Sequence, residues 1–181
     1  MRMAAPALWT VEQVLALPYD GNRYEVVHGE LLVTPFPNPE HEFTGAALRE
    51  ALYAYVERVP VGSVLGPIEL YIGEDTYLHP DMVILPTGRA AGRTWREMPR
   101  PILCVEIVST SSRLFDREQK RRAYLEHGVP MYWIVDSRTR TVEVWTPAAA
   151  HHAVVADTLS WSPVEGAEPF RITMGELFAG V

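Results

Sequence analysis

The chain has 181 residues, which suits one domain, because domains typically run from ~100 to 200 residues. Hydrophobic residues make up 48% of it, as in an ordinary globular protein, and no apolar run approaches the ~18 residues of a membrane span. The net charge of −7 argues against a general nucleic-acid binder, which usually has a basic surface. A protein with this net charge can still bind nucleic acid through a local basic patch.

The chain contains one cysteine, Cys104, so no internal disulfide can form. A single thiol and the lack of a signal-peptide pattern predict a cytoplasmic protein. The chain length predicts one domain, residues 1–181. Because Cys104 lies in an apolar stretch, and free cysteine is among the most buried residue types, we expect it to pack in the core.

The N-terminal segment predicts a short helix over residues 11–17 and then a β-hairpin with strands over 23–27 and 30–33. Glu25 lies on this hairpin. It is either an exposed strand carboxylate or a further acidic member of an active site.

Apolar residues recur at spacings of three and four over residues 41–57, which predicts an amphipathic helix. His41 begins this helix, where a histidine more often makes local hydrogen bonds. The alternative is that it faces a catalytic cleft. Two strands are expected next, over residues 63–65 and 68–72.

Asp81 follows Pro80 and precedes a short apolar run at residues 82–85. Proline is tolerated at the first residue of a strand, so Asp81 should lie at a strand entry, where its side chain can face a cleft. Residues 86–100 are rich in glycine and charge and predict a loop, which either clamps a substrate or is an ordinary linker.

Glu106 interrupts the apolar run at residues 101–108. Moving a lone carboxylate out of water costs roughly several kcal/mol unless a cation or hydrogen-bond donors compensate it. Strand side chains alternate, so Glu106 should share a face with Cys104 and Val108, and both faces are apolar, as in a central strand. A carboxylate at this position predicts a functional site.

A helix is predicted from Asp116 to the residue before Gly128. Asp116 and Gln119 have the form of an N-cap and its reciprocal partner, and glycine suits the position after a helix end. Lys120 shares a helix face with Tyr124, while neighbouring arginines cover the other sides. We therefore expect Lys120 to point toward the core or a cleft.

Arginines gather in two segments, residues 89–100 and 113–122, and they form either solvated surfaces or a phosphate track beside the site. Strands are predicted over residues 131–135 and 141–145, followed by edge strands and a closing helix. The aromatic residues Tyr132, Trp133 and Trp145 are expected to pack in the core or in an interface rather than to stack on bases.

Asp81 after Pro80, followed by Glu106 in an apolar strand, resembles the PD-(D/E)XK nuclease superfamily. In that superfamily an Asp and a Glu hold a divalent metal and a Lys helps to activate water. The position that usually holds this lysine is Val108 here, a departure that would abolish activity unless Lys120, at the place used in some branches, replaces it.

A longer pattern resembles the Uma-two family of proposed endonucleases, once catalogued only as a domain of unknown function. It covers nearly the whole chain, and only Thr110 departs slightly, where the family commonly has Pro. In chain order the pattern is Arg23-Tyr24-Glu25, Gly29-Glu30, His41, Pro80-Asp81, Glu106-Ile107-Val108-Ser109, Asp116 with Lys120, Tyr124, Gly128-Val129-Pro130 and Tyr132-Trp133-Ile134-Val135-Asp136.

The resemblance implies an α/β (α+β) fold with a restriction-endonuclease-like core, in which helices flank a central mixed β-sheet, with an N-terminal β-hairpin and extra C-terminal strands. It implies a magnesium-dependent endonuclease that acts on DNA as a homodimer, and the lack of a long apolar run predicts no association with a membrane. The expected metal ligands for Mg²⁺ or Mn²⁺ are Asp81, Glu106 and the backbone carbonyl of Ile107, and the catalytic candidates are Asp81, Glu106, Lys120, Glu25 and His41.

Two other functions stay open. A catalytically silent nuclease fold could serve protein association, with Val108 marking the lost activity, and such a fold would bind no Mg²⁺ or Mn²⁺ at the carboxylates. A hydrolase could instead act on a different phosphate ester, which a panel of duplex, single-stranded and nucleotide substrates would reveal.

Overall fold

The structure is a computed structural model, which describes residues 8–35, 37–87, 94–109, 112–148 and 151–181. Its elements, in chain order, are α1 (Val11–Leu15), β1 (Asn22–Val27), β2 (Glu30–Pro35), α2 (Pro39–Arg58), β3 (Gly62–Leu65), β4 (Leu70–Ile72), β5 (Thr76–Leu78), β6 (Met82–Pro86), the 3₁₀ turn η1 (Trp95–Glu97), β7 (Leu103–Ile107), α3 (Arg113–Phe115), the π-helical turn η2 (Asp116–Lys120), α4 (Arg121–Glu126), β8 (Tyr132–Asp136), β9 (Thr141–Trp145), β10 (Ala153–Val155), β11 (Thr158–Trp161), β12 (Phe170–Thr173) and α5 (Met174–Leu177).

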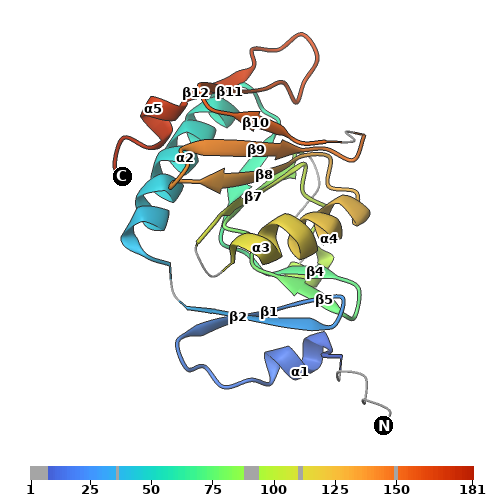
Figure 1. Cartoon of the computed structure of the whole chain (residues 1–181). Helices are drawn as coiled ribbons and strands as arrows, with labels where there is room; N and C mark the ends of the chain where they lie inside the picture. Colours follow the sequence, from blue (N-terminus) through green and yellow to red (C-terminus); the bar gives the residue numbers. More distant parts are fainter. Residues whose placement is uncertain (1–7, 36, 88–93, 110–111, 149–150) are drawn as a thin grey trace.

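The described strands form three sheets (Figure 1). A six-stranded sheet has the order β10-β9-β8-β7-β6-β3, a four-stranded sheet has the order β2-β1-β5-β4, and β11 pairs with β12. Figure 1 shows α1 and the β1–β2 hairpin at one end of the molecule and β11, β12 and α5 at the other. Within the described ranges, no helix is long and apolar enough to cross a membrane.

The six-stranded sheet is mixed because β7 and β8 run parallel while its other neighbouring strands run antiparallel. Parallel neighbours need a crossover connection of about a dozen residues or more, usually helical. Here α3, η2 and α4 provide that crossover. The topology therefore places the helix that carries Lys120 directly against the strand that carries Glu106.

Strand β7 is covered on both faces, as its apolar sequence predicted. Leu103, Val105 and Ile107 pack in one hydrophobic cluster with residues of α2. Cys104 and Val108 pack in the other, with Ala123 and Tyr124 of α4 and other residues. Cys104 has no exposed surface, which confirms its place in the core.

The predicted hairpin is present as β1 and β2, which pair from Asn22 with Pro35 to Val27 with Glu30. Its two-residue turn consists of His28 and Gly29, with φ angles of 49° and 80°. Two consecutive left-handed residues produce the turn whose twist suits a tight hairpin. The hairpin continues into a sheet through β5, where Val26 pairs with Tyr77.

The C-terminal strands close the α2 side of the main sheet. Trp161 and Phe170 pack against Trp133, with ring centroids 5.7 Å and 5.8 Å away. Trp133 and Tyr132 are fully buried, so the expectation that these aromatic rings pack in the core is confirmed. The expected fold is confirmed as well: a central mixed sheet flanked by helices, with an N-terminal hairpin and added C-terminal strands.

The predicted start of the helix at Asp116 is wrong. The helix begins one turn earlier, at Arg113, and Asp116 lies inside it, at the beginning of the π-helical turn. The Asp116 carboxylate is 1% exposed and lies 3.4 Å from the ammonium of Lys120. The Asp116 side chain, which the local pattern predicted to cap the helix, thus forms a buried ion pair with Lys120.

One strand was missed by the sequence pattern. The stretch from Thr76 to Leu78 forms β5, which joins β4 to the hairpin. It is only three residues long and has no alternation to distinguish it from a loop. The amides of His28 and Gly29 also bind at this segment, to the Thr76 hydroxyl and the Asp75 carbonyl.

Candidate active site

A cleft of about 340 Å³ lies where the hairpin, the first turn of α2 and the adjoining ends of β6 and β7 meet. Every residue proposed from the sequence as a catalytic or metal-binding group lines this cleft. The lining consists of Arg23, Glu25, Thr34, Pro35, Pro37, Asn38, His41, Asp81, Glu106, Ile107, Ser109, Ser112 and Lys120. The fold therefore brings together side chains that are up to 97 residues apart in the sequence, since Arg23 and Lys120 are both members.

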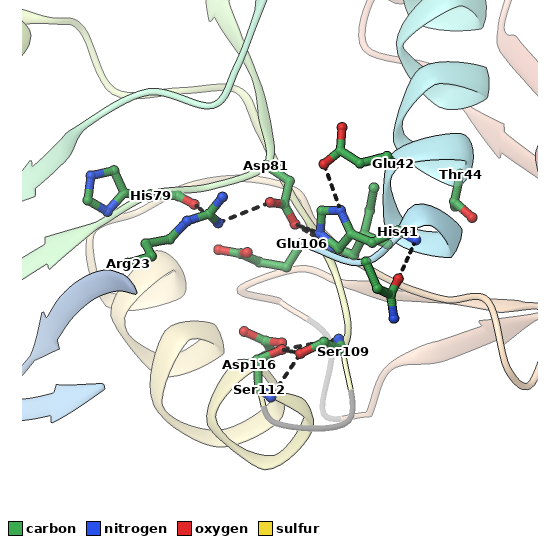
Figure 2. Close-up of polar contacts among 12 residues, drawn as sticks. Arg23, His41, Glu42, Thr44, His79, Asp81, Glu106, Ser109, Ser112 and Asp116 are labelled. Atoms are coloured by element: carbon green, nitrogen blue, oxygen red, sulfur yellow. Dashed lines mark hydrogen bonds and ion pairs between the residues drawn. The ribbon is translucent and has the colours of Figure 1, made fainter. Parts of the chain in front are cut away.

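Asp81 precedes β6 and uses both carboxylate oxygens. Its Oδ1 accepts a hydrogen bond from Arg23 at 3.2 Å, and its Oδ2 accepts one from the Ile107 amide at 2.8 Å. The Nε2 atom of His41 lies 3.0 Å from the same Oδ2, and Figure 2 shows Arg23 and His41 approaching Asp81 from opposite sides. Burial alone would raise the pKa of Asp81, but His41, Arg23 and this amide hold it below its ordinary value.

Lys120 is held by three carboxylates. Its Nζ atom lies 2.9 Å from Glu25 Oε2, 3.2 Å from Glu106 Oε1 and 3.4 Å from Asp116 Oδ1. Burial alone would lower the pKa of Lys120, yet these carboxylates keep it well above its ordinary value. The three carboxylates thus favour the ammonium form of Lys120 in the cleft wall.

Glu106 faces the α4 side of the sheet, as the alternation along β7 predicted. Its Oε1 accepts a hydrogen bond of 2.6 Å from the Tyr124 hydroxyl, in addition to the contact with Lys120. Burial raises the pKa of Glu106 well above its ordinary value, and the neighbouring carboxylates of Asp81 and Asp116 add to the rise. The lysine thus only partly offsets the cost of placing this charge in the core.

Glu25 is 1% exposed, so the alternative of an exposed strand carboxylate is wrong. Its Oε1 accepts the backbone amide of His79 at 2.7 Å, and its Oε2 contacts Lys120. The hairpin positions this side chain, because β1 lies between β2 and β5 and points Glu25 inward.

His41 combines the two alternatives stated for it. Its amide donates to the Asn38 side chain at 2.9 Å, an N-cap that starts α2, while its ring contacts Asp81 in the cleft. Burial alone would lower the pKa of His41, but the hydrogen bond and the charge of Asp81 raise it. A local cap and a cleft position are thus compatible.

The cleft and its wall hold more carboxylates than cations. Four buried carboxylates, Glu25, Asp81, Glu106 and Asp116, face the permanent charges of Lys120 and Arg23. Across the described residues, no group of three or more His, Cys, Asp or Glu side chains is arranged to hold a metal ion by itself. Asp81 and Glu106 line the cleft itself, and a hard divalent cation can be held by one or two carboxylates together with backbone, water or phosphate oxygens.

The arginines of the 113–122 segment are mostly engaged by the protein. Arg113 and Arg117 both lie within 3.3 Å of Asp136, and Arg117 also contacts Glu143 at 2.6 Å. The guanidinium of Arg121 lies 4.5 Å from the centre of the Trp145 ring. This pairing favours structural ion pairs over a phosphate track. Arg89 and Arg93 of the other segment, like Thr110, lie outside the described residues.

The sequence pattern missed two members of the site, Arg23 and Asp116. Arg23 lies two residues before Glu25 in β1, so strand alternation could have placed it on the same face. Asp116 lies four residues before Lys120, a spacing that puts helical side chains side by side. Val108, where the superfamily usually has its lysine, is 8% exposed and packs in the apolar cluster with Tyr124.

Comparison with known proteins shows the family and the fold of this chain. Residues 11–175 match the Uma2 family, which is described as "Putative restriction endonuclease". The fold is shared with a crystal structure described as "a putative nuclease belonging to DUF820" from Anabaena variabilis, with a TM-score of 0.75 and 19% identity over 94% of this chain and 98% of that chain. At that identity the likeness shows the fold alone. No curated protein is significantly similar to this chain.

Proposed function

We propose that this chain, which belongs to the Uma2 family of putative restriction endonucleases, is a divalent-metal-dependent endonuclease that hydrolyses phosphodiester bonds of DNA. One observation carries the proposal: two carboxylates from neighbouring strands, Asp81 directly before β6 and Glu106 in β7, share a cleft with a buried lysine from the following helix. Carboxylates that can hold a metal and a cation that can meet a phosphate are the components that phosphodiester hydrolysis needs.

Asp81 and Glu106, with the backbone carbonyl of Ile107, would hold Mg²⁺ or Mn²⁺. The excess of buried carboxylate supports this assignment, because a divalent cation would offset charges that the protein leaves partly uncompensated. When bound, the metal would supply a water of lowered pKa and positive charge beside the scissile phosphate.

Lys120 would stabilise the negative charge that develops on the phosphate and would orient the attacking water. It is the only lysine among the sixteen basic residues of the chain. A compact ammonium with three donors can sit among Glu25, Glu106 and Asp116, whereas a planar guanidinium needs a wider, fork-shaped site. The choice of lysine at this one position supports a specific role in the cleft.

Glu25, His41 and Arg23 would orient the other groups. Glu25 holds Lys120 from the hairpin, while His41 and Arg23 fix the two oxygens of Asp81. Groups fixed by such contacts lose less freedom when a substrate binds, which is how positioning contributes to catalysis.

A homodimer would suit the cutting of two DNA strands. The resemblance to the family supports this part of the proposal, and the edge strand β10 of the main sheet offers a surface, since Val154 is 58% exposed. An exposed apolar edge strand is a ready template for pairing with another chain.

The test is a panel of duplex DNA, single-stranded DNA, RNA and nucleotide phosphate esters, incubated with Mg²⁺, with Mn²⁺ and with a chelator. We expect metal-dependent internal cleavage of DNA that is lost in Glu106→Gln. Hydrolysis of nucleotide esters alone would support the alternative phosphate-ester hydrolase. Absence of both cleavage and metal binding would support the silent fold used for protein association.

A further inference from the structure

A smaller side pocket, of about 130 Å³, adjoins the cleft. It shares His41 and Asp81 with the cleft, so a group bound in it would lie next to the proposed catalytic carboxylate. The residues that α2 adds to its wall include Gly45, Ala46 and Arg49. Gly45 and Ala46 contribute little or no side chain to the pocket wall, and Arg49 contributes a charge.

Arg49 lacks a partner although it is not fully exposed. Its Nε atom is buried without a hydrogen bond, and none of its atoms forms an ion pair with the described residues. Arg138 and Arg171 also lack partners within the described ranges, but both are exposed, so water can satisfy them. A buried donor left unsatisfied costs about 1–3 kcal/mol, which calls for an explanation such as a ligand that supplies the acceptor.

The side pocket carries a second unpartnered polar atom. The Nδ1 atom of His41 is buried and makes no hydrogen bond to any residue that the structure describes, although the carboxylate of Glu42 lies 3.6 Å away. The Glu42 side chain is 69% exposed, so water screens its charge. Arg23, which also lines the pocket, adds a further guanidinium. Guanidinium donors are best matched by an anion with several oxygen acceptors, above all a phosphate.

We propose that the side pocket binds a backbone phosphate of the nucleic acid, next to the phosphate that is cut, with Arg49 as its main ligand. The inference rests on the proposed function and deepens it, because it assigns a subsite that fixes the register of the strand in the cleft. Arg23 lies at the boundary, lining both cavities while it pairs with Asp81.

Binding of a fluorescently labelled DNA duplex, followed by anisotropy in the presence of a chelator, separates binding from cleavage. We expect Arg49→Met to weaken binding about tenfold, the effect of losing one charged hydrogen bond. The slope of log K against log salt concentration should fall by about 0.9, which corresponds to one phosphate contact.

Arg58→Met is the matched control, because Arg58 lies on the same helix but outside these cavities and is already engaged. It donates to the Ala54 carbonyl at 2.7 Å and lies 3.6 Å from Glu168. Its loss should leave both the affinity and the salt slope at wild-type values.

Arg49→Lys keeps the positive charge but loses the planar, forked set of guanidinium donors. It should therefore weaken binding less than Arg49→Met and retain the salt slope. It also tests the inference if thermal melting shows that Arg49→Met does not fold. If the folded Arg49 variants bind DNA with wild-type affinity and salt slope while the wild type cleaves DNA, the inference about the side pocket is wrong and the proposed function stands. A wild type that neither binds nor cleaves DNA would overturn the proposed function and this inference together.

Discussion

At the scale of single residues, Lys120 has two tasks in this structure. Its ammonium lines the cleft, and it also compensates three carboxylates that are nearly inaccessible to water, on Glu25, Glu106 and Asp116. Removing one partner of a buried ion pair is strongly destabilising because it leaves an uncompensated buried charge. A substitution at Lys120 should therefore affect stability as well as cleavage.

Lys120→Met keeps most of the stem and deletes the charge. We expect cleavage by the folded protein to fall by about 10² or more, as when one preorganised donor is removed from a transition state. We also expect the free energy of unfolding to fall by about 3–5 kcal/mol, measured by urea denaturation.

Arg121→Met is the control for this substitution. Arg121 neighbours Lys120 but stacks on Trp145, so its loss should cost about 0.5–1 kcal/mol and little activity. Wild-type cleavage by Lys120→Met, together with a loss in Arg121→Met, would mean that the helix is only a phosphate-binding surface.

Glu25→Gln should rescue part of the stability that Lys120→Met loses. In the absence of the ammonium, the amide removes one of the uncompensated charges and keeps the acceptor for the His79 amide. A double-mutant cycle in urea should give a coupling energy of about 1 kcal/mol or more. Additive losses would show that the two residues do not share a charge network.

At the scale of elements, the site depends on the junction between β6 and β7. These strands pair from Met82 with Val105 to Ile84 with Leu103. Beyond this pairing, the Asp81 carboxylate accepts a hydrogen bond from the Ile107 amide. Met82 to Leu85 and all of β7 are buried, so the carboxylates of Asp81 and Glu106 are carried by rigid, packed backbone. A metal site on such strands would be held in place by the sheet.

Millimolar Mg²⁺ or Mn²⁺ should raise the melting temperature of the wild type but not that of Asp81→Asn. Metal binding would relieve repulsion among the buried carboxylates, and at about 100 times Kd it would stabilise the folded state by about 2.7 kcal/mol. Differential scanning fluorimetry measures the shift. The asparagine keeps an acceptor for the Ile107 amide, so the comparison isolates the charge.

Asp157→Asn provides the matched control for the metal, because Asp157 is an exposed residue in the turn between β10 and β11. It should respond to metal as the wild type does. Equal shifts in wild type and Asp81→Asn would remove the case for a metal shared by Asp81 and Glu106.

At the scale of the whole molecule, we expect a homodimer that associates through β10. Light scattering should give about twice the chain mass, and Val154→Lys should shift the population toward monomer, because a charge on an edge strand opposes pairing. Val164→Lys, at a residue that is 42% exposed but lies between β11 and β12, should stay dimeric. A wild type that is monomeric at all concentrations would contradict the prediction.

The sequence by itself determined the elements whose signals are local. Glu106 in an apolar strand, Asp81 after a proline and Lys120 on a helix face were visible because burial has a period of two in strands and about 3.6 in helices. The hairpin and the long helix α2 were predictable for the same reason. The nuclease fold was expected from the resemblance of the ordered motifs to a known family, and the local patterns identified Asp81, Glu106 and Lys120 as candidates, which line one cleft.

Only the tertiary structure decided which charges meet. Arg23 and Asp81 are 58 residues apart in the chain, and Arg117 finds Glu143 on a strand 26 residues away. No periodicity relates such residues, because their contact depends on how the hairpin and sheets pack. Asp116 best illustrates the limit of local sequence patterns. Its pattern predicted a helix cap, but the buried carboxylate is more stable beside the ammonium of Lys120.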